Sequence, residues 1–224
     1  MTTHPVDYPE EYTIWSVHFF GRDFVVTPDV LIPRLETECL IRRARKIIQE
    51  THIKQAIDIG CGSGIIGTSI ADIVDKVVFL DISPEALRIT ETNFCNNFPE
   101  KRADFIVSDL LAWLEQGSID PTMPILFLTN LPYIKDEDWK NMSTDTQFEP
   151  KLALFGWEKT GFELYEKLFV GIKNLGILPH GSRCIFEFWF DQRCIAETVL
   201  QSYSWKYSFF ADYAGIERFG EIEL

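Results

Sequence analysis

A short apolar run that ends in a proline-containing turn constrains this chain more than any other feature. Residues Ile125–Leu128 are all apolar, and Thr129-Asn130-Leu131-Pro132-Tyr133 follows them directly. Four apolar residues bounded by such a turn are typical of a parallel strand that is buried on both faces. Ligands of open α/β sheets bind beyond the carboxyl ends of the strands. We therefore expect Asn130 to lie at a ligand site.

The polar groups of this turn suit a planar amine. The Asn130 side-chain oxygen and the Leu131 carbonyl could accept both hydrogens of one NH2 group, and the Tyr133 ring offers it a flat face. Acceptors aimed in advance at a nitrogen stabilise the positive charge that develops as it attacks a methyl group. The same residues also fit a plain strand exit with a Pro132 turn, so the prediction depends on the upstream sequence.

Strand and helix patterns alternate along the chain. The predicted strands cover residues 55–59, 76–81, 103–107, 125–130, 183–190, 205–211 and 218–224, and the predicted helices cover 36–50, 65–73, 83–97, 162–175 and 191–203. This order predicts an α/β fold with a doubly wound, seven-stranded, mostly parallel sheet and an antiparallel C-terminal strand. A loose arm up to about Glu11 and a small β-hairpin, Ile14–Phe19 paired with Asp23–Val26, are expected before it.

The first central strand runs into a glycine-rich loop, Asp58-Ile59-Gly60-Cys61-Gly62-Ser63-Gly64. Dinucleotide sites need the spacing G-x-G-x-x-G, whereas the acid Asp58 repels a pyrophosphate and can pair with a sulfonium or ammonium group. Asp81 ends the next strand, where an acid can accept both hydroxyls of a ribose. Asp109 and Leu110 follow the third strand and could receive and cover an adenine. One glycine loop alone is only a tight turn, but in this order the features predict an S-adenosylmethionine site.

The composition narrows the classes of partner. A formal net charge of −13 repels phosphate backbones, which disfavours nucleic acid. Five scattered cysteines without a C-x-x-C pair indicate a reduced, cytoplasmic protein, and four isolated histidines predict no metal site. The sequence has neither a signal-peptide pattern nor an apolar run of membrane length, so no membrane contact is expected.

The chain resembles the HemK/PrmC family of class I methyltransferases from about Tyr12 to Leu224. The segments that carry the resemblance are Val26–Arg34, Glu36-Thr37-Glu38, Asn130–Tyr133, Glu149-Pro150 and Asp212–Arg218. Members of this family transfer a methyl group from S-adenosylmethionine to the side-chain amide nitrogen of a glutamine in peptide-chain release factors. The resemblance implies a Rossmann-like methyltransferase domain at residues 35–224, preceded by an N-terminal arm and hairpin at residues 1–34.

The resemblance also implies roles for individual residues. We expect cofactor contacts from Asp58, Gly60, Cys61, Gly62, Gly64, Asp81, Ile82, Asp109, Leu110 and Asn130. The catalytic and substrate-binding residues would be Asn130, Leu131, Pro132 and Tyr133, which would hold the target amide. Arg34 would either steer a substrate carboxylate or form a surface salt bridge. Glu187, in the middle of a strand, is costly when buried unless it is paired, so we expect a hydrogen-bonded structural role for it.

Two departures from the family pattern affect these expectations. Leu131 replaces a family proline, although its carbonyl remains and Pro132 still favours an extended Leu131. The proline's fixed φ is lost, a stiffness effect of about 0.4–1 kcal/mol, so we expect weakened but not abolished activity. The resemblance begins near the hairpin, so we also expect the chain to lack the helical N-terminal domain that helps family members grip the release factor.

Three functions remain open at this point. The leading one is methylation of a glutamine amide in the Gly-Gly-Gln loop of a release factor. The second is methylation of the N6 amino group of adenine in DNA or RNA, because a base is also planar and carries an NH2 group; the acidic composition argues against it. The third is a cofactor-binding partner protein with weakened catalysis, which Leu131 and the expected missing domain favour.

Overall fold

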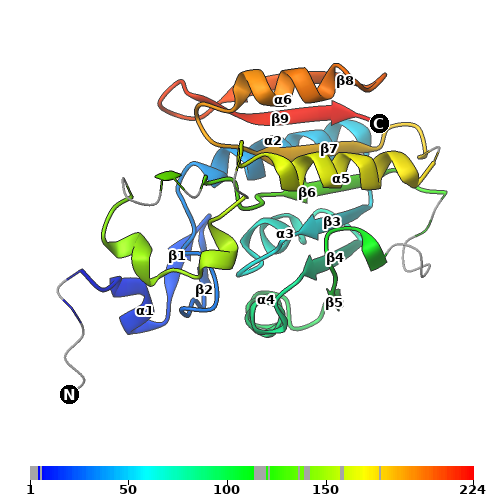
Figure 1. Ribbon diagram of the computed structural model, residues 1–224. Coiled ribbons are helices and arrows are strands. Elements are labelled where there is room, and N and C mark those ends of the chain that lie inside the picture. Colours follow the sequence, from blue (N-terminus) through cyan, green and yellow to red (C-terminus); the bar gives the residue numbers. More distant parts are fainter. Residues whose placement is uncertain are drawn as a thin grey trace.

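The central feature of the fold is one seven-stranded sheet. The computed structural model describes residues 5, 7–113, 120, 122–135, 137–138, 142–156, 159–176 and 178–224 (Figure 1). Within these residues the strand order is β5-β4-β3-β6-β7-β9-β8. The strands are β3 (Gln55–Ile59), β4 (Lys76–Asp81), β5 (Asp104–Val107), β6 (Ile125–Thr129), β7 (Arg183–Glu187), β8 (Lys206–Ala211) and β9 (Glu217–Glu223). Only β9 runs antiparallel to its neighbours, so the predicted mostly parallel sheet is confirmed.

Helices cover both faces of this sheet (Figure 1). One face carries α2 (Thr37–Thr51), α3 (Ile65–Ile70) and α4 (Pro84–Asn97), and the other carries α5 (Glu163–Asn174) and α6 (Arg193–Leu200). In β6, Leu126 and Leu128 point into the first hydrophobic core, whereas Ile125 and Phe127 point into the second. Because both faces are covered, this strict alternation is hidden in the sequence as a continuous apolar run.

The N-terminal hairpin is shorter than predicted. β1 (Val17–Phe19) pairs with β2 (Arg22–Phe24), so the predicted pairing of Ile14–Phe19 with Asp23–Val26 is too long at its open end. Glu10–Ile14 instead forms the short helix α1, with two acids in its first turn. Acids at the positive end of a helix favour it, a local signal that the alternating apolar pattern obscured.

The arm before the hairpin packs against the domain rather than extending from it. The Tyr12 hydroxyl donates to the Val30 carbonyl at 2.6 Å, and the Tyr8 ring meets Phe148 edge-on at 5.1 Å. The Asn93 side chain, on α4, bonds both backbone groups of Val25, at 2.6 and 2.9 Å. Of these residues only Tyr8 belongs to the predicted loose arm, and it packs on Phe148; the division at residues 34 and 35 remains a prediction. The segment lies beyond the carboxyl ends of the parallel strands (Figure 1).

Several elements end earlier than their patterns predict. α3 stops at Ile70 because the next amides fold into tight turns, with Ala71 N–H donating to Thr68 and Ile73 N–H to Ile70. β7 stops at Glu187 because residues 189–192 form a turn, in which Gln192 N–H donates to the Trp189 carbonyl at 2.9 Å. Two short 3-10 helices, η3 (Asp145–Phe148) and η4 (Lys151–Ala153), lie in the long connection after β6. In the described part of the chain, no helix has the length and apolar character to cross a membrane.

Gly67 and Gly171 offer a matched test of the packing between α3 and the sheet. A Cβ at Gly67 would clash with the Phe79 ring and lie 3.0 Å from an Asp58 carboxylate oxygen. Gly67→Ala is therefore expected to lower the free energy of unfolding by about 1–3 kcal/mol. A Cβ at Gly171, within α5, would lie 3.6 Å from Leu111, an ordinary contact, so Gly171→Ala should raise it by about 0.5–1 kcal/mol. Urea unfolding measures the change in free energy of unfolding for both variants. Equal changes in the two variants would contradict the close packing of Gly67 against Phe79.

Candidate active site

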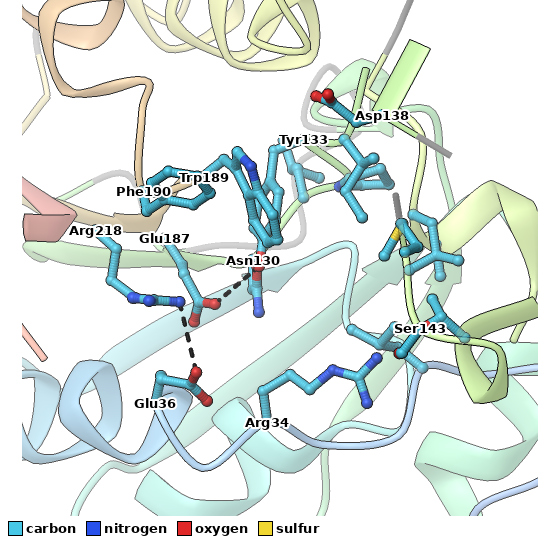
Figure 2. Close-up of a pocket in the computed structure, with 18 of the residues that line it drawn as sticks. Arg34, Glu36, Asn130, Tyr133, Asp138, Ser143, Glu187, Trp189, Phe190 and Arg218 are labelled. Atoms are coloured by element: carbon cyan, nitrogen blue, oxygen red, sulfur yellow. Dashed lines mark hydrogen bonds and ion pairs between the residues drawn. The ribbon is translucent and has the colours of Figure 1, made fainter. Parts of the chain in front are cut away.

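Two cavities meet at the carboxyl end of β6. The first, which we call the loop cleft, has a volume of about 480 Å³, and its lining includes four segments at the ends of parallel strands: Gly60–Ser63, Asp81–Ser83, Ser108–Leu110 and Asn130–Pro132. The second, which we call the outer cavity, has a volume of about 700 Å³, and its lining includes Asn130–Ile134, Glu187, Trp189–Asp191 and Arg218. Six residues line both cavities: Leu31, Arg34, Asn130, Leu131, Pro132 and Ala153. Asn130 therefore lies at the boundary between them (Figure 2).

The glycine loop is held in place by backbone hydrogen bonds to the neighbouring strand. The amides of Gly60 and Cys61 both donate to the Leu80 carbonyl, at 2.8 and 3.0 Å. The Asp81 carboxylate accepts from the amides of Gly62 and Ser83, each at 2.9 Å. Burial raises the pKa of Asp81, and these backbone donors limit the rise. Asp81 thus connects the ends of β3 and β4 where they border the cleft.

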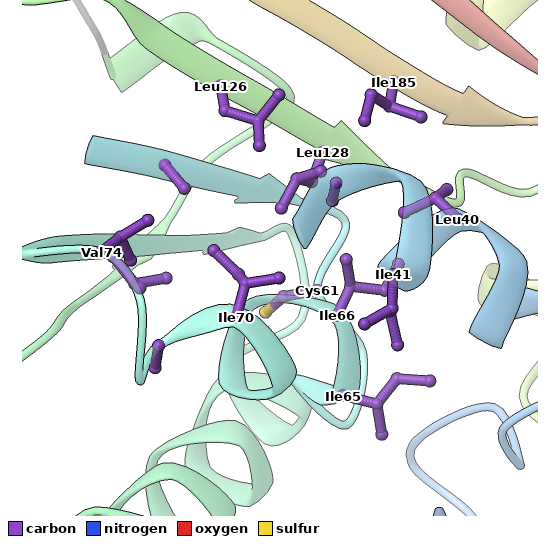
Figure 3. Close-up of a cluster of buried hydrophobic side chains, with 14 of the residues drawn as sticks. Leu40, Ile41, Cys61, Ile65, Ile66, Ile70, Val74, Leu126, Leu128 and Ile185 are labelled. Atoms are coloured by element: carbon purple, nitrogen blue, oxygen red, sulfur yellow. The ribbon is translucent and has the colours of Figure 1, made fainter. Parts of the chain in front are cut away.

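Cys61 faces away from the loop cleft. Its side chain is buried in the hydrophobic core beside Ile66 and Ile70 (Figure 3). The Cys61 Sγ atom lies 3.4 Å from the hydroxyl oxygen of Thr90. Cys61 therefore borders the cleft through its backbone, and burial raises the pKa of its thiol well above the usual range.

Two of the predicted cofactor residues lie outside the lining of the loop cleft. Asp58 is 1% exposed, and one carboxylate oxygen accepts from the Gly67 amide in α3 at 2.8 Å. Burial raises the pKa of Asp58 to about 7. Gly64 lies at the start of α3 and faces Thr90. The structure thus places Asp58 beneath the loop, where it joins β3 to α3, while Ile82, Asp109 and Leu110 border the cleft and their contacts with a cofactor remain predictions.

The turn after β6 is anchored at three positions. The Asn130 side-chain nitrogen lies 3.4 Å from Thr37 Oγ1 and donates to it, and the Tyr133 hydroxyl donates to Glu187 at 3.1 Å. Between them, the Leu131 amide donates to the hydroxyl of Tyr165 on α5 at 2.9 Å. Each anchor comes from a different element, so the turn is fixed relative to α2, α5 and β7.

The Leu131 side chain lies between the turn after β6 and the glycine loop. Its side chain is 4% exposed, and its Cδ2 atom lies 2.8 Å from where a Cβ would be at Gly60. Gly60 has φ +66°, a backbone conformation that suits glycine. A side chain at position 60 would therefore be strained and would also displace Leu131.

Glu187 is the buried charge of the site. It is 1% exposed, and its carboxylate accepts from Thr37 Oγ1 at 2.8 Å and from the Tyr133 hydroxyl (Figure 2). Desolvation raises its pKa from the ordinary 4.5 to about 7, while the two hydroxyl donors and nearby Arg218 oppose the rise. The expected hydrogen bonding of this acid is confirmed, and its partners belong to the walls of both cavities.

Arg34 forms an ion pair with Glu149, whose side chain is buried. The other Glu149 oxygen accepts from the Ile32 amide at 3.0 Å. Of the two roles considered for Arg34, the structure contains the salt bridge, although one partner is buried rather than at the surface. Arg34 also lines both cavities, so contact with a substrate remains a prediction.

Sequence analysis missed three residues that shape the site. Thr37 was noted only as part of the segment Glu36-Thr37-Glu38, but its hydroxyl donates to Glu187 at the site. Tyr165 gave no signal beyond its place on an apolar helix face. The Trp189 ring lies 5.5 Å from the Tyr133 ring, inclined by 33°, and extends the flat wall of the outer cavity.

Comparisons with known proteins assign the chain to a family. Residues 37–146 match the family described as the methyltransferase small domain. A release factor glutamine methyltransferase of Clostridium botulinum is 31% identical over 203 residues, which cover 88% of this chain and 69% of that protein. This chain belongs to the release factor glutamine methyltransferase family. The family member of Borreliella burgdorferi is 37% identical over 174 residues, 77% of this chain and 58% of that protein.

The share of each relative that the chain matches, and its similarity to solved structures, determine how much the family assignment says about the chain. The chain spans 58% and 56% of the length of the first two curated relatives that it matches. Among solved structures, the hMettl16 catalytic domain in complex with a MAT2A 3′UTR hairpin aligns with a TM-score of 0.66 at 13% identity. That alignment covers 91% of this chain and 76% of the other, and it supports the class I methyltransferase fold.

The buried carboxylate of Glu187 predicts a pH-dependent stability. A raised pKa means that the folded state holds the proton more tightly than the unfolded state. The resulting stabilisation is complete below pH 4.5 and is lost as the pH rises through about 7, on the order of 3 kcal/mol at about 1.4 kcal/mol per pKa unit. In urea unfolding, the free energy of unfolding should therefore fall more between pH 5 and pH 8 for the natural protein than for Glu187→Gln. Glu166→Gln, at an exposed position, controls for the change in net charge. If the free energy of unfolding fell equally in all three proteins, the raised pKa of Glu187 would be contradicted.

Proposed function

We propose that this chain transfers a methyl group from S-adenosylmethionine to the side-chain amide nitrogen of a glutamine in a peptide-chain release factor. The observation that carries the proposal is the position of Asn130 at the boundary of the two cavities. One cavity would hold the methyl donor and the other the acceptor, so the two reactants would meet at this side chain. The cytoplasmic location expected from the sequence is part of the same proposal.

The residues of the loop cleft fit S-adenosylmethionine. Its volume of about 480 Å³ falls within the range of about 300–1,000 Å³ typical of small-molecule sites. Apart from Gly62 and its two chain neighbours, no heavy atom of the described residues lies within 4 Å of where a Cβ would be at Gly62, so the loop backbone is open to a ligand there. Asp81 would accept ribose hydroxyls, and the exposed Asp109 would accept from the adenine amino group. We propose these roles, together with backbone contacts from Gly60 and Cys61.

The chemistry follows from the acceptors at the turn. When bound, S-adenosylmethionine supplies a methyl group on a positively charged sulfur, which leaves as a neutral thioether with the electron pair of the broken bond. The Asn130 side-chain oxygen and the Leu131 carbonyl would accept the two N–H groups of the glutamine amide. None of the described residues donates a hydrogen bond to that carbonyl, so it is available. These acceptors stabilise the nitrogen as it becomes positive, and the methylated nitrogen then loses one proton to water.

The two alternative functions gain no support from the comparisons. The matched curated relatives named above are release factor glutamine methyltransferases, not adenine methyltransferases. The similarity to the hMettl16 structure is at 13% identity and concerns the fold alone. A cofactor-binding protein with weakened catalysis would not need the open acceptor carbonyl of Leu131.

Replacing Asp81 tests the proposed cofactor site. Asp81→Asn keeps the size of the side chain but removes its charge, and hydrogen bonds to charged groups contribute about 1.5–3 kcal/mol. Calorimetry should therefore show S-adenosylmethionine binding weakened by about 10–100-fold. Asp104→Asn is the control, because Asp104 pairs with Lys76 and is 45% exposed, and exposed pairs contribute little. Unchanged affinity in Asp81→Asn would exclude this carboxylate from the site.

Replacing Asn130 tests the proposed transfer itself. With labelled S-adenosylmethionine, a purified release factor should gain one methyl group on the glutamine of its Gly-Gly-Gln loop. Asn130→Ala should lower kcat by about 10²–10³-fold, the usual effect of removing one preorganised dipole. Asn97→Ala is the control and should leave kcat unchanged, because within the described residues the Asn97 side chain, at the end of α4, bonds to the Asp23 and Asn93 carbonyls and lines neither cavity. Label on DNA or RNA instead of the protein, or no transfer despite bound cofactor, would overturn the proposal.

A further inference from the structure

We propose that Thr37 is a positioning residue that determines which way the side-chain amide of Asn130 faces. The proposal rests on the proposed function, because it concerns the acceptor oxygen that this function requires. Thr37 borders the loop cleft, but the role that we propose for it is not contact with a reactant. It acts through a chain of two hydrogen bonds, from Asn130 to Thr37 and from Thr37 to the buried carboxylate of Glu187.

The direction of this chain follows from counting hydrogens. A carboxylate has no hydrogen to donate, so the bond of 2.8 Å between Thr37 Oγ1 and Glu187 must use the single hydroxyl hydrogen of Thr37. The Thr37 oxygen is then only an acceptor toward its other neighbour. Asn130 must present its NH2 group, because its oxygen would meet another oxygen there. The separation of 3.4 Å allows a hydrogen bond in that orientation and only repulsion in the other.

The fixed orientation places the Asn130 oxygen on the side away from Thr37. A side-chain amide has an oxygen on one side and a nitrogen on the other, so an Asn without a committed partner could turn either way. If the amide turned over, a donor would replace the acceptor and would repel the NH2 group of a substrate. No described residue donates to the Asn130 oxygen, which is therefore open for a substrate.

Glu187 is suited to impose this direction because it is itself fixed. Its second oxygen accepts from the Tyr133 hydroxyl, and its backbone carbonyl accepts from Tyr165 on α5. Thr37 is 1% exposed, so water does not compete for its hydroxyl. The charges that face the carboxylate are Arg218 on β9 and Glu36 at the start of α2. The two hydrogen bonds from Glu187 to Thr37 and from Thr37 to Asn130, which we call the relay, thus connect β7 through α2 to the turn after β6.

The test is a set of three hydroxyl variants, assayed well above the pKa of Glu187, which burial raises to about 7. Thr37→Val keeps the shape and removes the relay, so kcat should fall by about 10–100-fold, the usual cost of losing an outer hydrogen-bond partner. Thr37→Ser keeps the hydroxyl and should stay within about threefold of the natural kcat. Thr51→Val, in the same helix, removes a hydroxyl that bonds only to the Ile47 carbonyl, and kcat should not change. Calorimetric affinity for S-adenosylmethionine should be similar in all of them.

Equal kcat values for Thr37→Val and Thr37→Ser would overturn the inference, because a packing role does not distinguish them in this way. A second measurement does not depend on turnover. In NMR spectra the Asn130 side-chain NH2 hydrogens should exchange faster with water in Thr37→Val than in the natural protein, and unchanged exchange would also overturn the relay. If the natural protein transfers no methyl group, the proposed function fails, and this NMR comparison still decides the orientation of Asn130.

Discussion

The buried carboxylate of Glu187 is the interaction on which the arrangement of the site depends. Burying a charge costs several kcal/mol unless hydrogen bonds and nearby charges compensate it. The compensation comes from Thr37 on α2, from Tyr133 after β6 and from the field of Arg218 on β9. Each of these groups must stay in place for the carboxylate to remain buried, so the elements that carry them are fixed relative to β7. The carboxyl edge of the sheet is therefore rigid where the two cavities meet.

Leu131 shows how this chain replaces a stiff residue of its family with specific contacts. Sequence analysis expected a stiffness loss of about 0.4–1 kcal/mol and weakened activity. The structure adds a hydrogen bond from the Leu131 amide to Tyr165, which a proline could not make, and such bonds contribute about 0.5–1.5 kcal/mol. The side chain also packs against Gly60 and so joins the turn to the glycine loop. The hydrogen bond is of the same size as the lost stiffness, and the weakened activity expected from the sequence stays a prediction.

Sequence patterns predicted the parts of the fold that depend on local burial. The strands Gln55–Ile59 and Lys76–Asp81 have the predicted bounds, because residues buried on both faces leave continuous apolar runs. The short helix α1 was missed, and the predicted hairpin exists with shorter strands than expected, since three to five residues carry too little periodicity. Asp58 shows a different limit: its place at a strand end predicted a cofactor contact, which stays a prediction, but gave no sign that one of its oxygens accepts from the Gly67 amide. The Thr37–Glu187 bond joins residues 150 positions apart, so no local pattern could indicate it.

The two cavities differ in how the chain builds them, and this difference bears on what each can select. One side of the loop cleft consists of turns at adjacent strand ends, which the sheet itself holds in register, and residues 28–31 and 150–155 contribute to its remaining lining. The outer cavity is closed by segments from distant parts of the chain, and the Arg34–Glu149 ion pair joins two of them across 115 positions. Its rim also carries Phe190, which is 54% exposed and free to meet a large partner. Substitutions in this wall can therefore change its shape without disturbing the sheet. Under the proposed function, the strand-end turns would hold the methyl donor site while the wall around Trp189 and Phe190, which lines the outer cavity and not the loop cleft, would determine which protein presents the glutamine.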